Sequence, residues 1–457
     1  QHYEEKLYIF NKIVKKITHL VLFLSANIIS LAHGAALGWL SPMLLILQST
    51  DSPLVSGPLS VSEASWLGSI FCFGGIGGNY LMGFIANAFG RKRALSFLAI
   101  PQITFWLMVI FGNHINFLYT ARVFAGLAGG GTFVTVPLFV SEIADKRIRG
   151  SLGSLLFLTV NIGILTGFVI GANLPYHLVP KVFVGIPAVF FITILFLPET
   201  PQFLLSKGDE EGAKKSLEFY KNIKPVGKEN LEKFNGYFKE LTDHINSSAA
   251  KTKLSFADFK NLKSIFFGLV VVSIYILGGG FAVVTYTANI FKQSGSDLNP
   301  NTSSIIVALN QILGTYVSTL TVDRLPRKVL LAVSTCGSAL GYIVTGAFSM
   351  FAETYDLSEV KWIPVASLSF AIFIGCVGYI PLTFVVLAEL LPQKIRPIAS
   401  SVCNSFLNLL AFGLLKVFPP LMLQIGLHGV MWGFAGICIL GMLFIILFLP
   451  ETKGKSI

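Results

Sequence analysis

Long apolar stretches separated by short polar segments make up most of the chain. A membrane-spanning α-helix needs about 20 apolar residues. By that measure the pattern predicts twelve spans, six on each side of a long polar segment at 198–263. The predicted spans are 18–47, 63–86, 94–112, 116–140, 150–173, 178–197, 264–291, 302–322, 328–351, 361–388, 397–424 and 426–449. We therefore expect an all-α membrane protein.

The phrase LFLPET closes the sixth predicted span at Leu195–Thr200 and recurs at Leu447–Thr452, after the twelfth. Two further repeats follow the same order along the chain: Gly90-Arg91-Lys92 matches Pro326-Arg327-Lys328, and Glu142 with Arg149 matches Glu389 with Arg396. Because repeats in one order indicate a duplicated unit, the sequence predicts two pseudo-symmetric six-helix bundles. Parallel repeats of this kind are one known architecture of secondary transporters.

The repeats and the polar segment together define the expected domains. They are a cytoplasmic N-terminal segment at 1–17, a six-helix bundle at 18–197, a cytoplasmic helical linker at 198–263, a second six-helix bundle at 264–449 and a cytoplasmic tail at 450–457. In the linker, apolar residues from Leu231 to Ile245 recur at steps of three and four. This spacing indicates an amphipathic helix.

The composition agrees with a membrane location. Hydrophobic residues make up 53% of the chain, the mean hydropathy is +0.72 and only 12% of the residues are charged. Soluble domains have about 25% charged residues. The five cysteines fall in apolar stretches without paired spacing, so we interpret them as small core residues rather than as disulfides or metal ligands. We expect no metal and no cofactor.

A formal net charge of +11 would suggest nucleic-acid binding if the protein were soluble. Here Lys and Arg are concentrated in the N-terminal segment, the linker, the tail and alternate loops, whereas the intervening loops hold Lys181, Lys292 and Lys361. Because basic residues favour the cytoplasmic side, both termini and the linker are predicted to be cytoplasmic. We expect contact with membrane lipid and no nucleic-acid partner.

Basic side chains away from the ends of the predicted spans include His33 in the first, Arg122 in the fourth and Lys416 in the eleventh. Ionisable groups are costly there and are therefore functional candidates. Lys416 falls near the outer end of its span, and we expect its amine to extend to the interface. Arg122 either hydrogen-bonds helix backbones or lines a cavity, and His33 either joins helices or couples proton movement.

No Asp or Glu lies well inside any predicted span. Proton-driven transport needs a group that loads and unloads a proton within the membrane, and a buried carboxylate beside an arginine suits that task. The sequence has the arginine without the acid. This pattern favours passive transport down a gradient.

Neutral polar side chains inside the spans are the candidate ligand contacts. They are Asn161, Thr285, Asn310, Gln311, Asn404 and Asn408, and aromatic neighbours include Tyr275, Phe281, Tyr286, Tyr379 and Phe384. Amides hydrogen-bond hydroxyl groups, and aromatic rings pack against the C–H faces of sugars. A charged substrate would require a buried counter-charge. The pattern therefore indicates a small neutral sugar.

Several motifs together resemble the sugar porter family of the major facilitator superfamily over nearly the whole chain. They are GFIANAFGRK at Gly83–Lys92, Arg122 with Gly126, Glu142 with Arg149-Gly150, PETPQFL at Pro198–Leu204, Asp323-Arg324 with Arg327-Lys328, Glu389 with Arg396-Pro397, and PETKG at Pro450–Gly454. Ser65-Trp66 and the text NIGIL in the fifth span look most like insect facilitated trehalose transporter-like proteins.

The resemblance implies alternating access around a central site between the two bundles. It also implies a cytoplasmic salt-bridge network, which would consist of Arg91, Glu142, Arg149 and Glu199 in the first half and Arg327, Glu389, Arg396 and Glu451 in the second. If the network forms only when the cytoplasmic side is closed, it shifts the equilibrium between the two access states toward that closed state.

The binding site implied by the resemblance departs from the family pattern. Tyr275, Ile276 and Phe281 stand where the family has sugar-binding amides in the seventh span, Phe157 replaces a glutamine, with Asn161 one turn on, and Phe384 replaces a tryptophan. Gln311 and Asn408 keep polar groups, and the acid of proton-coupled members falls near Leu40-Ser41. The implied substrate-binding residues are Asn161, Tyr275, Phe281, Gln311, Phe384 and Asn408.

The sequence as a whole predicts a facilitative (uniport) sugar transporter of the plasma membrane that carries a monosaccharide or trehalose. It predicts a transporter rather than an enzyme. Two alternatives stay open at this point: a proton-coupled symporter that uses His33, and a non-transporting sugar sensor with an altered pocket.

Overall fold

The computed structural model describes residues 2–144, 149–222, 228–250, 262–391 and 396–453. Within these ranges, the side chains of 2–24, 149–154, 228–229, 244, 247–250, 262 and 396–398 lie outside the description. All regular secondary structure in the described part of the chain is helical. The predicted all-α fold class is confirmed.

The first half of the chain forms one bundle. Its helices are α1 (His2–Leu47), α2 (Val61–Ser69), α3 (Phe71–Phe89), α4 (Arg91–Phe111), α5 (Ile115–Ile143), α6 (Arg149–Asn173), α7 (Val179–Phe183) and α8 (Gly185–Leu195). Helix α2 begins with a capping box, in which the Ser60 hydroxyl and the Glu63 carboxylate each accept a backbone N–H of the other residue.

The second half forms a matching bundle. Its helices are α12 (Leu262–Leu277), α13 (Gly280–Thr285), α14 (Thr287–Gln293), α15 (Pro300–Thr321), α16 (Arg327–Phe351), α17 (Ile363–Val377), α18 (Tyr379–Leu390), α19 (Arg396–Gln424) and α20 (Gly426–Leu447), with a 3-10 turn at Ser358–Val360. The linker between the bundles contains α9 (Pro201–Ser206), α10 (Glu210–Lys221) and α11 (Lys228–Ala250).

Eleven helical segments among the described residues are long and apolar enough to cross a membrane. The sixth predicted span corresponds to the shorter helical segment Val179–Leu195, which is divided between α7 and α8. The seventh predicted span, at 264–291, is also divided. Gly279 has a left-handed φ of 85°, and a Cβ there would lie 2.4 Å from the Phe434 ring, so α12 ends where only glycine fits.

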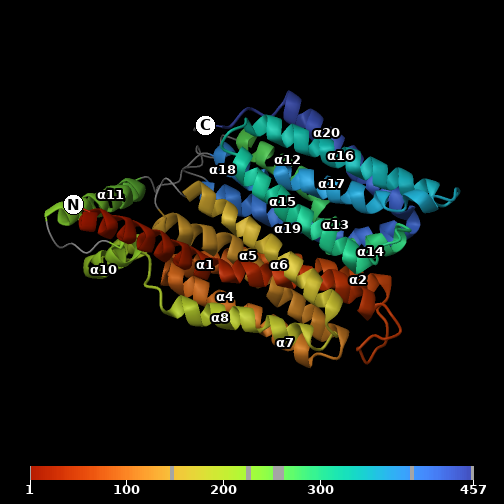
Figure 1. The fold of residues 1–457 in the computed structure, drawn as a ribbon, viewed down its shortest axis with the longest axis horizontal. Coiled ribbons are helices and arrows are strands. Elements are labelled where there is room, and N and C mark those ends of the chain that lie inside the picture. The colour runs from red at the N-terminus through yellow and green to blue at the C-terminus, as the bar shows by residue number, and fades with distance from the viewer. Residues whose placement is uncertain (1, 145–148, 223–227, 251–261, 392–395, 454–457) are drawn as a thin grey trace.

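The two bundles lie side by side with their helices roughly parallel (Figure 1). Helices α10 and α11 and both ends of the chain lie at one end of the molecule, together with the starts of α4 and α16. We name this the charged end, and we name the other, where α2, α7 and α14 lie, the far end. Between the bundles, α6 packs against α15, and α19 packs against α2 and α3.

Candidate functional site

A central cavity of about 140 Å³ lies between the two bundles, near the middle of their helices. All six substrate-binding residues predicted from the sequence line it: Asn161, Tyr275, Phe281, Gln311, Phe384 and Asn408. His33, Thr285, Thr315 and Asn404 also line it, whereas Asn310 lines a separate groove on the flank between α15 and α17. No Asp, Glu, Lys or Arg is among the described residues that line the cavity.

A hydrogen-bonded trio joins the two bundles at the cavity. The Asn161 amide donates to the Thr315 hydroxyl at 2.7 Å, and the Gln311 amide donates to the Asn161 oxygen at 2.9 Å. Asn161 and Gln311 are 8% and 7% exposed. Asn161 is thus engaged with the opposite bundle in this conformation. The sequence reasoning missed Thr315, because its role depends on the approach of α6 to α15.

Aromatic rings from both bundles form another wall of the cavity. The Phe384 ring lies 6.1 Å from Phe133, 5.4 Å from Phe157 and 5.8 Å from Tyr275, measured between ring centroids. Such ring pairs are stabilising beyond the apolar area that they bury. The wall gives a ligand apolar faces to pack against. The sequence reasoning did not single out Phe133.

Arg122 is 1% exposed and does not line the cavity. Its guanidinium donates to the backbone carbonyls of Leu67 and Ala36, both at 3.1 Å, and lies 4.8 Å from the centroid of the Phe71 ring. Of the two predicted roles, the structure shows hydrogen bonding to helix backbones. Among the described residues, no carboxylate forms an ion pair with Arg122.

At the far end, Lys416 joins the bundles. Its amine donates to the Ser65 hydroxyl at 2.9 Å and lies 4.2 Å from the centroid of the Trp66 ring. The Asn289 amide donates to the Gln48 side chain at 2.9 Å, which adds a second contact between the bundles. The far end is therefore closed by polar contacts in this conformation.

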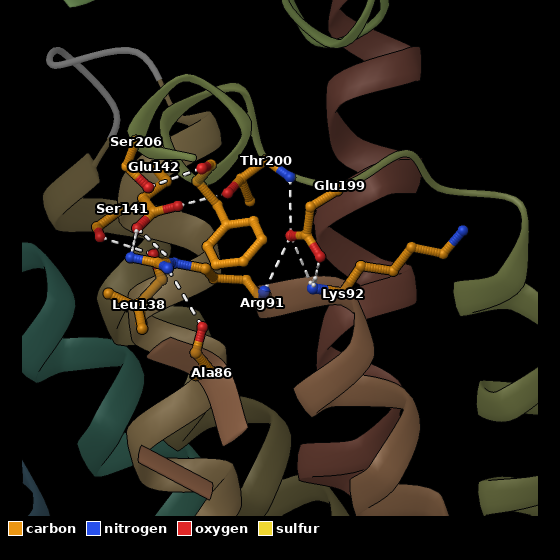
Figure 2. Close-up of polar contacts among 10 residues, drawn as sticks. Ala86, Arg91, Lys92, Leu138, Ser141, Glu142, Glu199, Thr200 and Ser206 are labelled. Atoms are coloured by element: carbon orange, nitrogen blue, oxygen red, sulfur yellow. Dashed lines mark hydrogen bonds and ion pairs between the residues drawn. The ribbon is translucent and has the colours of Figure 1, made fainter. Parts of the chain in front are cut away.

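The first charged cluster, defined as Arg91, Glu142, Glu199 and Thr200, lies at the charged end of the first bundle (Figure 2). The Arg91 guanidinium pairs with Glu142 at 2.8 Å, and the Thr200 hydroxyl donates to the other Glu142 oxygen at 2.5 Å. Glu199 accepts the backbone N–H groups of Arg91 at 2.9 Å and Lys92 at 3.0 Å. Its carboxylate thus caps the positive N-terminus of α4.

The second charged cluster, defined as Arg327, Glu389, Glu451 and Thr452, repeats this arrangement. Arg327 pairs with Glu389 at 3.3 Å, and the Thr452 hydroxyl donates to Glu389 at 2.5 Å. Glu451 accepts the backbone N–H groups of Arg327 at 2.9 Å and Lys328 at 3.2 Å. The structure thus brings together six of the eight residues of the predicted network, three in each bundle.

The other two residues of the predicted network are Arg149 and Arg396, at the starts of α6 and α19. Their side chains lie outside the described residues. The sequence reasoning also missed Thr200 and Thr452. The repeated phrase LFLPET could have indicated them, since both threonines occupy its last position.

Linker helix α10 covers the first charged cluster. The Ser216 hydroxyl donates to the Glu199 carbonyl, and the Tyr220 hydroxyl donates to the Pro198 carbonyl at 2.6 Å. Burial raises the pKa of Tyr220, which keeps the hydroxyl a hydrogen-bond donor. The linker is thereby tied to the first bundle.

The Glu451 carboxyl has a pKa below its usual value of 4.5. Burial raises this pKa, but hydrogen bonds from backbone N–H groups together outweigh the effect of burial. The donors are Lys453, Lys328, Arg327 and Thr452. Glu451 is consequently ionised at neutral pH, as its position at the N-terminus of α16 favours.

The chain is similar in sequence to known sugar transporters. Residues 25–457 match the family described as sugar (and other) transporter. The chain is 31% identical to the facilitated trehalose transporter Tret1 of Polypedilum vanderplanki over 96% of its own length and 86% of the relative. It is also 31% identical to Tret1 of Anopheles gambiae, where it covers 96% of itself but only 55% of that longer relative.

A solved structure has a similar fold. The inward open conformation of the xylose transporter XylE from E. coli gives a TM-score of 0.79 at 20% identity, over 96% of this chain and 98% of that one. At this identity the likeness concerns the fold alone. The prediction of two bundles of the major facilitator type is confirmed.

Proposed function

The chain belongs to the sugar (and other) transporter family of the major facilitator superfamily, and we propose that it is a facilitative sugar transporter of the plasma membrane. It carries a monosaccharide or trehalose by alternating access of the central cavity to the two ends of the molecule. The trehalose transporters among its relatives support the choice of sugars.

The neutrality of the central cavity is the observation that carries this proposal. The polar groups that line it are amides, hydroxyls and one imidazole, and its apolar wall is aromatic. Neutral amides suit the hydroxyl groups of a sugar, and aromatic rings suit its C–H faces. The relatives and the cavity therefore both support a neutral sugar as the substrate.

Transport is proposed to be independent of protons. Among the described residues, the buried Arg122 is held by two backbone carbonyls, and no carboxylate lines the cavity. A proton-coupled symporter that uses His33 is the alternative, and the structurally similar XylE is described as a proton:xylose symporter. The two modes differ in accumulation, because only coupled transport concentrates sugar against its gradient.

The charged end is proposed to face the cytoplasm, which follows from the distribution of Lys and Arg. The two charged clusters then lie on the cytoplasmic side, where each fixes the start of one helix of its own bundle. Each cluster connects residues within one bundle, so the clusters keep the bundles rigid as the bundles move against each other.

The test is the uptake of labelled glucose and trehalose into proteoliposomes that contain the purified protein. We expect saturable uptake of at least one sugar. The Gln311→Ala variant should lower the affinity, because it removes an amide from the cavity and releases Asn161. Absence of uptake in folded protein would contradict the proposal and favour a non-transporting sugar sensor.

A further inference from the structure

Helix α2 belongs to the first bundle by sequence but packs largely against the second. A turn at Ile70 separates it from α3. It packs more extensively against α19 of the second bundle than against α3 or α5 of its own bundle. Transporters with two repeated bundles change access by rocking one bundle against the other. The contacts between α2 and α19 must therefore break whenever the far end opens.

Lys416 provides the polar part of the contact between α2 and α19. Its amine donates to the Ser65 hydroxyl at 2.9 Å and to the Ser62 carbonyl at 3.4 Å. The same amine lies 4.2 Å from the centroid of the Trp66 ring. Phe412, one turn earlier on α19, lies 5.8 Å from that ring, measured between centroids. One face of α19 thus holds α2 through a cation and an aromatic ring.

The groups that hold the Lys416 amine are all neutral. Among the described residues, no carboxylate forms an ion pair with it. Glu63 on the same helix is engaged in the capping box with Ser60. An enclosed ion pair is costly to break, whereas an amine on a hydroxyl, a carbonyl and a ring can exchange these partners for water. The Trp66 ring is 39% exposed, so this exchange needs no large rearrangement.

Other contacts of α2 indicate which bundle it moves with. Arg122 of α5 donates to the Leu67 carbonyl at 3.1 Å and so fixes α2 to the first bundle. Tyr286 of the second bundle also reaches α2, because a Cβ at Gly68 would lie 2.1 Å from its hydroxyl oxygen. That hydroxyl donates to the Leu415 carbonyl of its own bundle at 3.0 Å. Tyr286 can therefore leave α2 without losing a hydrogen bond, whereas Lys416 cannot.

We propose that Lys416 is a positioning residue for transport, which holds α2 against α19 and thereby sets how often the central cavity opens to the far end. The inference rests on the alternating access of the proposed function. Lys416 does not line the cavity, so it acts through α2 and not on the sugar. The Asn289–Gln48 hydrogen bond at the same end joins two neutral amides, and bonds from a charged donor are stronger.

A contact that exists in only one of two states shifts the equilibrium toward that state. Lys416→Met keeps an apolar side chain of similar length and removes the cation. It should therefore increase the population in which the far end is open. Lys416→Arg keeps a cation that can stack on Trp66, and it should stay close to wild type.

The modification of Cys72 measures how often the far end opens. This thiol lines the central cavity and is enclosed in the present conformation. In intact cells, a small membrane-impermeant methanethiosulfonate added outside reaches Cys72 only through the open far end, and mass spectrometry quantifies the modified residue. We expect modification about 10-fold faster in Lys416→Met than in wild type, and restored to near the wild-type rate in Lys416→Arg.

Lys361→Met is the matched control. It removes a lysine at the same end of the molecule, but Lys361 pairs with Asp297 at 3.1 Å within the second bundle. The rate of Cys72 modification should equal that of wild type. An increase as large as in Lys416→Met would overturn the inference, because the effect would then come from loss of surface charge.

Transport kinetics distinguish this role from a merely structural one. A larger population open to the outside raises the apparent affinity for external sugar, so the KM for uptake by Lys416→Met should fall severalfold. Damage to the fold would reduce the amount of active protein and lower the maximal rate without lowering KM. A KM equal to or above that of wild type would contradict the proposed role.

The results separate this inference from the proposed function. Normal sugar uptake with an unchanged rate of Cys72 modification in Lys416→Met would overturn the inference and leave the proposed function standing. Faster modification in Lys416→Met, without uptake of any sugar by wild type, would overturn sugar transport and leave the control of the far end by Lys416 standing.

Discussion

The two charged clusters have the same hydrogen bonds and different surroundings. In the first, Glu142 is 5% exposed and lies 2.8 Å from Arg91, whereas in the second, Glu389 is 25% exposed and lies 3.3 Å from Arg327. Helices α9 and α10 follow the first LFLPET phrase, and Ser216 and Tyr220 of α10 bond the backbone of Glu199 and Pro198.

The difference shows what the repeated sequence determines and what it leaves to the rest of the fold. The repeat places an arginine, two glutamates and a threonine at the start of a helix in each bundle. The linker adds contacts to the first cluster, where Ser216 and Tyr220 bond the backbone beside Glu199. Because an ion pair that is shielded from water is more costly to break, the same substitution should have unequal effects in the two bundles.

The largest expected difference is between Glu142→Gln and Glu389→Gln. The two arginines are similarly enclosed, but the Glu142 carboxylate is more buried and its ion pair is shorter. Losing this pair should cost about 3 kcal/mol, whereas the longer pair of the more exposed Glu389 contributes about 1 kcal/mol or less. Glu142→Gln should therefore lower the thermal stability of the detergent-purified protein clearly more than Glu389→Gln. Equal shifts in the unfolding midpoint would show that the linker does not shield the first cluster.

The helix starts offer a second comparison, between Gly90→Ala and Pro326→Ala. Gly90 has a left-handed φ of 110°, and a Cβ there would lie 2.2 Å from the Glu199 carboxylate. Pro326 has a φ of −60°, which alanine adopts without strain. We expect Gly90→Ala to destabilise the protein by about 2 kcal/mol and Pro326→Ala by less than about 1 kcal/mol. A smaller effect at Gly90 than at Pro326, in the same thermal assay, would contradict the geometry.

Tyr220→Phe tests how firmly α10 is held over the first charged cluster. The substitution removes the hydrogen bond to the Pro198 carbonyl and keeps the ring against Phe139, so it should cost about 1 kcal/mol. The control is Tyr237→Phe on α11, whose side chain is 39% exposed and should change stability by less than about 0.5 kcal/mol. Limited proteolysis within the linker would report whether α10 detaches, and equal cleavage of both variants would argue against the role of Tyr220.

The smallest expected effect concerns pH and the second cluster. The pKa of Glu451 is lower in the folded protein than its usual 4.5, so its ionised form stabilises the fold above that value. This contribution is lost as the pH falls through the lowered pKa. Glu451→Gln should therefore be slightly less stable than wild type at pH 7, and the difference should fade as the pH falls from 4.5 through the lowered pKa. Thermal unfolding of both proteins at several pH values measures this difference in stability. A difference that grows on acidification would contradict the lowered pKa of Glu451.

Most of the fold was predictable because it depends on local sequence. Apolar length located the spans, and the repeated phrases located the clusters. The sixth span was predicted at 178–197, and its helical segment is shorter, at Val179–Leu195. The break between α12 and α13 was not predicted, although the local signal is present as three consecutive glycines at 278–280, of which Gly279 has the positive φ.

The cavity was only partly predictable. All six predicted contacts line it, but their pairing depends on distances between helices of opposite bundles. Asn161 was predicted as a substrate contact, and the structure shows it bonded to Gln311 and Thr315. The sequence left two roles open for His33. The absence of a hydrogen bond to His33 was visible only once the side chains around it were placed.

The measurement that tests the central proposal most directly is sugar uptake into proteoliposomes with and without an inward proton gradient. The neutral cavity and the backbone-bonded Arg122 predict uptake that reaches the external sugar concentration and does not respond to the gradient. Accumulation of sugar above the external concentration when the outside is acidic would contradict the account and establish proton coupling.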